Sequence, residues 1–144
     1  MSATPTATHV VVAEPDADTR EQLVAAVSEV ASSLGHDVTV HEASSGTSAF
    51  AACSEHKPQL LIAEVLLDGL SGLTLLRRLS VESKSKTAVV FVTDLARDHD
   101  RYWALRNGAL AYLTKPFDAA TLRSKITRVL TQGPEASRDA PARI

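Results

Sequence analysis

The chain has 144 residues and a formal net charge of −2, with 44% hydrophobic and 22% charged residues, which is the balance of one ordinary globular domain. The small net charge argues against direct nucleic-acid binding, and no apolar run approaches the roughly 20 residues of a membrane span. A single cysteine, Cys53, excludes an intrachain disulfide and reads as a small buried helix residue.

The two ends of the chain differ in composition from its middle. Residues 1–8 are mostly Ser, Thr, Ala and Pro, and residues 132–144 carry little core material. We therefore expect two flexible tails around one domain at 9–131. The N-terminus has neither the basic region nor the apolar core of a secretory signal, so we expect a cytoplasmic protein.

Short apolar runs alternate with helix-length amphipathic segments between these ends. The predicted strands are 9–13, 37–41, 59–64, 88–92 and 111–113. The first, third and fourth are apolar without alternation, which is typical of parallel strands buried on both faces.

The segments between the strands repeat near 3.6 residues, as amphipathic helices do. Asp16 or Asp18 can cap the first helix, and Gly35 can end it. Ser45 and Gly46 open the second helix. The residues that share the inner faces are Leu23, Val27, Val30 and Leu34 in the first helix, Leu73, Leu76 and Leu79 or Ser80 in the third, Ala104 and Gly108 in the fourth, and Leu122, Ile126 and Val129 in the fifth.

Five strands alternating with five helices predict an α/β fold, a doubly wound five-stranded parallel sheet. Ligands of such sheets lie beyond the carboxyl ends of the strands. The residues predicted there are Glu14, Glu64, Thr93 and Lys115. Two acids, a hydroxyl and an amine suggest a cation or phosphoryl site, and a plain surface ion pair is the alternative.

Three segments stand out: residues 10–16 (VVVAEPD), 58–64 (PQLLIAE) and 107–117 (NGALAYLTKPF). Together they resemble the response-regulator receiver family, in which the first looks like the first strand and acidic pair, the second like the third strand, and the third like the most specific segment. The resemblance covers about residues 8–131. It implies a (βα)5 flavodoxin-like fold with strand order 2-1-3-4-5, a cis bond before Pro116, and a non-enzymatic role in two-component or phosphorelay signal transduction.

In receivers that carry phosphate, an aspartate after the third strand accepts the phosphoryl group of a histidine kinase. The resemblance places Glu64 at this phosphoacceptor position, and it places Thr93, Tyr112 and Lys115 at the switch positions that respond to the phosphoryl group. Glutamate adds one methylene, which moves the carboxylate outward by roughly 1.3–1.5 Å. Phosphoryl transfer depends on placement at that scale.

The metal-binding positions of the family are altered as well. Two acids after the first strand would hold Mg²⁺, but here Glu14 is followed by Pro15, which cannot coordinate a cation, and Asp16 comes one residue late. Asp94 adds bulk and negative charge beside Thr93. We therefore expect an acidic pocket of Glu14, Asp16 and Asp94 that holds no cofactor and binds Mg²⁺ weakly or not at all.

These departures predict a stand-alone pseudo-receiver that acts by phosphorylation-independent protein–protein interaction. The alternative is a conventional phosphorylatable single-domain response regulator. Without a metal, Lys115 should pair with Glu64, and Thr93 should donate a hydrogen bond to the same carboxylate. Tyr112 is either a switch ring or a half-buried strand tyrosine. A flavin protein is disfavoured, because residues 14–18 are acidic and lack glycine.

The expected partners are other signalling proteins, bound at the face formed by the fourth helix, fifth strand and fifth helix. Tyr102 and Trp103 are consecutive and point about 100° apart, so at least one should be exposed, with Arg106 nearby. The alternative is that both rings pack on the fifth helix. A homodimer through this face is compatible with the sequence. No membrane or DNA partner is expected, since no residues follow the domain for a DNA-binding module.

The five histidines show no metal-ligand spacing, so no metal site is expected from them. Each of the five is interpreted most simply as a strand-end or surface histidine: His9, His36, His41, His56 and His99.

Overall fold

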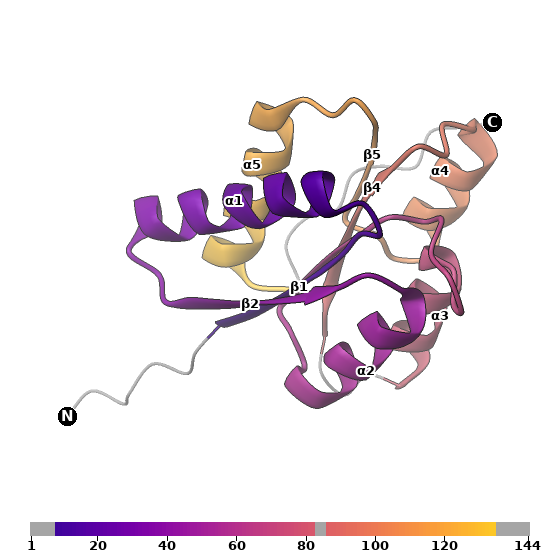
Figure 1. Ribbon diagram of the computed structural model, residues 1–144, viewed down its shortest axis with the longest axis horizontal. Helices are drawn as coiled ribbons and strands as arrows, with labels where there is room; N and C mark the ends of the chain where they lie inside the picture. Colours follow the sequence, from indigo (N-terminus) through magenta and orange to yellow (C-terminus); the bar gives the residue numbers. More distant parts are fainter. Residues whose placement is uncertain (1–7, 83–85, 135–144) are drawn as a thin grey trace.

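The computed structural model describes residues 8–82 and 86–134 (Figure 1). Five parallel strands form one sheet in the order β2-β1-β3-β4-β5, which confirms the predicted fold and strand order. The strands are β1 (Thr8–Ala13), β2 (Val38–Ala43), β3 (Leu60–Ala63), β4 (Ala88–Thr93) and β5 (Ala111–Thr114). The helices are α1 (Ala17–Leu34), α2 (Gly46–His56), α3 (Gly72–Glu82), α4 (Asp98–Arg106) and α5 (Ala119–Gln132).

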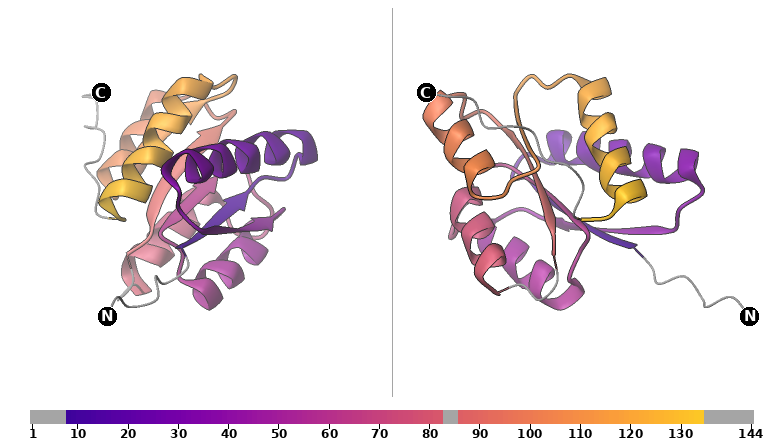
Figure 2. Two further views of the ribbon diagram at one scale, coloured as in Figure 1. Left: turned by 90° about the vertical axis from the view of Figure 1, so that its left-hand side faces the viewer. Right: turned by 180° about the vertical axis from the view of Figure 1, so that it is seen from behind.

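Helices cover both faces of the sheet, and successive strand residues point to opposite faces. Val10 and Val12 pack in the core beneath α1 and α5, while Val11 and Ala13 pack in the core beneath α2, α3 and α4. Figure 2 shows these two helix layers from the side and from behind. Within the described residues, no helix is both long and apolar enough to cross a membrane.

Local hydrogen bonds start and end the helices where the sequence predicts. Of the two candidate caps of α1, Asp16 is the one used, and its side chain accepts a hydrogen bond from the backbone N–H of Thr19. Gly35 ends α1 in the left-handed conformation, with φ of 68°. Ser45 begins α2 in a reciprocal capping box with Ser48.

Two helix faces differ from the prediction. In α3 the predicted Leu76 is buried, but Leu73 and Leu79 are only partly buried and the fully buried Leu75 was not predicted, because the centre of the buried face lies slightly nearer the start of the helix than predicted. In α4 the buried residues are Ala104 and its neighbour Leu105. The helix ends at Arg106, so the predicted inner-face residue Gly108 lies beyond it in the turn before β5.

The first strand and the last helix each extend slightly beyond their predicted bounds. Thr8 pairs with Val38 of β2, and α5 continues to Gln132. The rest of the two predicted tails, 1–7 and 135–144, lies outside the described residues.

Candidate functional site

Four side chains meet at the carboxyl edge of the sheet, as predicted. Glu14 follows β1, Glu64 follows β3, Thr93 ends β4 and Lys115 follows β5. The sheet pattern continues one residue past three strands: Glu14 N–H donates to Ala43 (2.9 Å), Glu64 N–H to Ala13 (2.9 Å) and Lys115 N–H to Thr93 (2.8 Å). These backbone bonds hold the side chains in a buried pocket, where Glu14 and Glu64 are only 2% and 3% exposed.

The ammonium group of Lys115 lies between the two buried carboxylates. Its Nζ is 2.6 Å from Glu14 Oε1 and 3.1 Å from Glu64 Oε1. A longer contact of 3.6 Å reaches Asp94, whose side chain is largely exposed at the rim. The predicted Glu64–Lys115 ion pair is therefore present, and the shorter pair with Glu14 adds to it.

Glu64 accepts hydrogen bonds on both of its carboxylate oxygens. Oε2 accepts from the Thr93 hydroxyl and from the Leu66 N–H at 3.0 Å, and Oε1 accepts from the Asp94 N–H at 3.2 Å as well as from Lys115. Burial alone would raise the pKa of Glu64, but these four donors outweigh it and hold the pKa below its ordinary value.

The pKa of Lys115 is shifted in the direction that keeps this residue charged, as is the pKa of Glu64. Burial alone would lower its pKa, but its hydrogen bonds and charge attraction to the two glutamates outweigh burial and raise the pKa above its ordinary value. Both partners of the Glu64–Lys115 pair are therefore kept charged at neutral pH.

Asp16 does not belong to the acidic pocket, which corrects the prediction. Its carboxylate caps α1, accepting hydrogen bonds from the Thr19 N–H (2.9 Å) and hydroxyl (2.7 Å), and these bonds lower the pKa of Asp16. Only its backbone reaches inward, where its N–H donates to Glu14 Oε2 at 2.9 Å. Because Pro15 follows Glu14, the second acid of the chain comes one residue later than in the family pattern. At that position its carboxylate binds the start of α1 and does not enter the pocket.

The switch residues form a connected path from the pocket. Thr93 Oγ1, which donates to Glu64, accepts a hydrogen bond from the Leu95 N–H at 3.1 Å. The Leu95 carbonyl accepts from the Tyr112 hydroxyl at 2.5 Å. Tyr112 is 4% exposed, and its ring packs against the Phe91 ring in a T-shaped arrangement, with ring centroids 5.8 Å apart. Burial, followed by the nearby Asp100 and Glu64 charges, raises the pKa of Tyr112 to about 12.

The peptide bond between Lys115 and Pro116 is cis, as the family resemblance implies. It lies directly after the lysine that enters the pocket.

The donors in this pocket fit a magnesium ion poorly. Mg²⁺ needs near-octahedral oxygen ligands. The carboxylates of Glu14 and Glu64 are already bound to Lys115, Pro15 has no side-chain ligand, and Asp16 is directed to its helix cap. Among residues 8–82 and 86–134, every buried side-chain nitrogen and oxygen has a hydrogen-bond partner within the protein. No buried oxygen in this part of the chain therefore lacks a partner that a cation would have to supply.

The aromatic pair on α4 lies as expected. Trp103 is 36% exposed, which confirms that at least one ring is at the surface, and Tyr102 is half-buried. Arg106, the last residue of α4, is exposed on the same helix. Figure 1 shows α4 beside β5 at the end of the sheet opposite β2.

Three of the five histidines form a cluster, which the sequence interpretation did not include. The imidazole rings of His9, His41 and His56 contact one another, while His36 and His99 are exposed elsewhere. Burial, followed by the neighbouring histidines, lowers the pKa of His41. Sequence reasoning missed this cluster because no short spacing links the three positions.

Comparison with known proteins identifies the family. Residues 10–127 match the response regulator receiver domain. Protein PilH of Pseudomonas aeruginosa is 34% identical over 97 residues, which are 67% of this chain and 78% of PilH. The transcriptional regulatory protein YkoG of Bacillus subtilis, itself described as uncharacterised, is 37% identical over 107 residues, 73% of this chain but only 45% of YkoG.

Solved structures show the same fold at lower identity. The receiver domain of Francisella response regulator 1452 superimposes with a TM-score of 0.73 at 23% identity, covering 87% of this chain and 98% of that one. A signal receiver domain from an HD domain-containing protein of Pseudomonas fluorescens gives a TM-score of 0.75 at 20% identity, covering 88% and 97%. The chain therefore belongs to the response regulator receiver domain family, whose members are signalling modules of two-component systems.

Proposed function

We propose that this chain is a pseudo-receiver, which signals by binding other proteins without being phosphorylated. The observation that carries the proposal is the position of the Lys115 ammonium, 2.6 Å from Glu14 and 3.1 Å from Glu64. In receivers that carry phosphate, a metal ion and a phosphoryl group would share this space. Here one internal cation balances both acids, so the folded chain needs neither group and should bind Mg²⁺ weakly or not at all.

Phosphorylation of Glu64 would have to break this arrangement. A carboxylate oxygen that attacks phosphorus must first release its present donors, and each oxygen of Glu64 has two. Release would leave a buried charge without partners, which is costly. The longer side chain also displaces the attacking oxygen, and the exposed Asp94 repels an incoming anion at the rim.

The same contacts support a fixed, phosphorylated-like conformation. The Glu64 carboxylate binds the Thr93 hydroxyl and Lys115, the two groups that contact phosphoryl oxygens in phosphate-carrying relatives. Thr93 is held inward, and through Leu95 it is linked to the buried Tyr112. Glu64 would thus imitate the phosphorylated side chain and keep the switch residues in one state.

The output surface in this proposal is the face formed by α4, β5 and α5. Trp103 and Arg106 are exposed there, and an aromatic flanked by arginine is a common anchor at protein interfaces. The proposed partners are other signalling proteins or a second copy of the chain. Sedimentation velocity of wild type and Trp103→Ala distinguishes a homodimer from binding to other proteins alone, because a homodimer through this face should dissociate in the variant.

Intact mass after incubation with acetyl phosphate and Mg²⁺ tests the proposal. We expect no added mass on the wild type. A matched double variant, Pro15→Asp with Glu64→Asp, restores the second acid and the shorter acceptor, and it should gain about 80 Da, the mass of one phosphoryl group. An adduct on wild-type Glu64 would instead support the conventional phosphorylatable alternative.

A further inference from the structure

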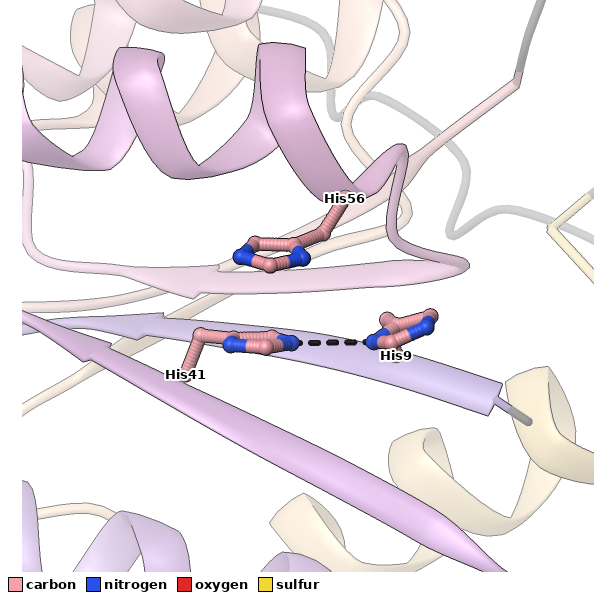
Figure 3. Close-up of side chains that lie close together, drawn as sticks. All are labelled: His9, His41 and His56. Carbon is pink, nitrogen blue, oxygen red and sulfur yellow. Dashed lines mark hydrogen bonds between the residues drawn. The ribbon is translucent and has the colours of Figure 1, made fainter.

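Three histidines from three different elements lie together on the α2 side of the sheet (Figure 3). His9 is in β1, His41 is in β2 and His56 is the last residue of α2. Their ring centroids are 5.1 Å apart for His9 and His41, 5.5 Å for His9 and His56, and 3.6 Å for His41 and His56. All three are half-buried, so a small ion can reach them from solvent.

The fold explains why residues so far apart in the sequence meet. His41 is paired with Val11 in the parallel register of β1 and β2, and His9 lies two residues before Val11, so both histidines point to the same face. Helix α2 covers that face and runs back along the strands, as crossover helices do, so its final residue, His56, lies above them.

The nitrogen atoms of the cluster are spaced for shared coordination. His9 Nδ1 and His41 Nε2 face each other at 2.9 Å, and one ring nitrogen from each of the three residues lies within 4.8 Å of the others. A tetrahedral zinc ion with bonds of about 2.0–2.1 Å separates its ligand nitrogens by about 3.3 Å. The His9–His41 pair needs only a small opening, and the metal would replace the proton that the two nitrogens now share.

His56 would need a side-chain rotation to act as a third ligand. Its ring is stacked on His41 with an interplanar angle of 12°, so its nitrogens lie in a parallel plane and do not yet point toward the other two. His56 is the half-buried last residue of α2, so its side chain has room to rotate. Such a rotation would turn one ring nitrogen toward His9 and His41. The neighbouring Glu55 carboxylate lies 3.6 Å from His56 Nε2 and is exposed to solvent. Carboxylates in this position orient histidine ligands of metal ions.

We propose that His9, His41 and His56 form a binding site for a divalent transition metal ion of the zinc class, with Glu55 as the carboxylate that balances its charge. Imidazole ligands select zinc, copper or nickel over magnesium and calcium, whose preferred ligands are oxygens. Three histidines leave a fourth position for water or a further ligand. The bound ion would tie the end of α2 to β1 and β2.

This site is independent of the acidic pocket. His9 lies near the start of β1, and Glu14 directly follows its end. The two residues are five positions apart, which corresponds to about 16 Å at about 3.3 Å per residue. The two groups also use no common residue. Failure of one proposal therefore leaves the other unaffected.

Metal titration of the untagged, chelator-stripped full chain tests the site. We expect one Zn²⁺ per chain in competition with a chromophoric chelator, and a ligand-field spectrum of four-coordinate Co²⁺ when cobalt is used instead. His41→Asn and His56→Asn should each weaken binding by at least about tenfold. His36→Asn and His99→Asn, which change exposed histidines elsewhere, should bind as wild type, and so should Glu64→Gln.

A second measurement needs no variant and so does not depend on variant folding. In the proton NMR spectrum of the wild type, Zn²⁺ should shift the imidazole resonances of three of the five histidines, those of the cluster. The proposal is overturned if fewer than one ion binds per chain, if His41→Asn and His56→Asn keep wild-type affinity, or if the resonances of His36 and His99 shift equally.

Discussion

The ion pair between Lys115 and Glu14 joins atoms 2.6 Å apart from residues that are 101 positions apart in the chain. It links the carboxyl end of β5 to that of β1, across the two intervening strands β3 and β4. Glu64, at the end of β3, lies along this path and receives the same ammonium group. One partly buried cation therefore connects three strand ends.

Lys115→Ala should lower the free energy of unfolding by about 3–5 kcal/mol, because it leaves two buried carboxylates without their counter-ion. Urea titration followed by circular dichroism measures this. Asp94→Asn is the matched control: it removes the longest and most exposed of the three pairs and should change stability by no more than about 0.5 kcal/mol. An unchanged urea midpoint for Lys115→Ala would show that the lysine does not stabilise the pocket.

The contribution of Glu64 should depend on pH in one direction. Because its folded pKa lies below the ordinary value of 4.5, its stabilisation is complete above pH 4.5 and is lost as pH falls through the folded pKa. The difference in unfolding free energy between wild type and Glu64→Gln should therefore be largest at neutral pH and shrink in acid. A difference that stays constant down to acid pH would contradict the charged state of Glu64.

The stabilisation by the Glu64–Lys115 pair should also be lost at alkaline pH, when Lys115 loses its proton. Its folded pKa lies above the ordinary value of 10.5, so its stabilisation is complete below pH 10.5 and is lost as pH rises through the folded pKa. Unfolding free energies measured on the alkaline side should show wild type losing stability there, relative to Lys115→Ala.

Tyr112→Phe should lower the free energy of unfolding by about 1 kcal/mol, since it removes the hydroxyl that donates to the Leu95 carbonyl but keeps the ring against Phe91. Thermal or urea unfolding measures the loss. Tyr102→Phe provides a comparison on the neighbouring helix, where no hydroxyl bond of this kind is described. Equal effects of the two variants would argue against a special role of the Leu95 contact.

Cys53 should be unreactive in the folded protein. Its side chain is 3% exposed, and burial raises the pKa of the thiol to about 12, so very little thiolate is present at neutral pH. A chromogenic disulfide reagent should label no thiol in the native chain and one thiol in denaturant. Rapid labelling of the native chain would show that α2 opens readily from the sheet.

Sequence patterns predicted the features that depend on local order. Apolar runs located the strands within one or two residues, and Asp16, Gly35 and Ser45 were found where helices begin or end. The four residues of the pocket were predicted because parallel strands bring their carboxyl ends to one edge. The Glu64–Lys115 pair followed from charge balance, once the altered metal-binding positions of the receiver resemblance left Lys115 as the available cation.

Features that depend on tertiary detail were not predictable in this way. The Asp16 side chain could bind either the pocket or the start of α1. Which of the two it binds depends on the direction of the backbone after Pro15, and the sequence pattern does not give that direction. The histidine cluster depends on the register of β1 with β2 and on the length of α2, neither of which leaves a short spacing in the sequence.

The most direct test of the internal counter-ion is a Mg²⁺ titration followed by two-dimensional NMR of backbone amides. The amides of Leu66 and Asp94 donate to Glu64, so they report on that carboxylate. In wild type these resonances should stay unshifted as Mg²⁺ is added, while the Pro15→Asp, Glu64→Asp double variant should show saturable shifts. Saturable shifts of Leu66 and Asp94 in the wild type would contradict the account, because a metal ion would then occupy the place assigned to Lys115.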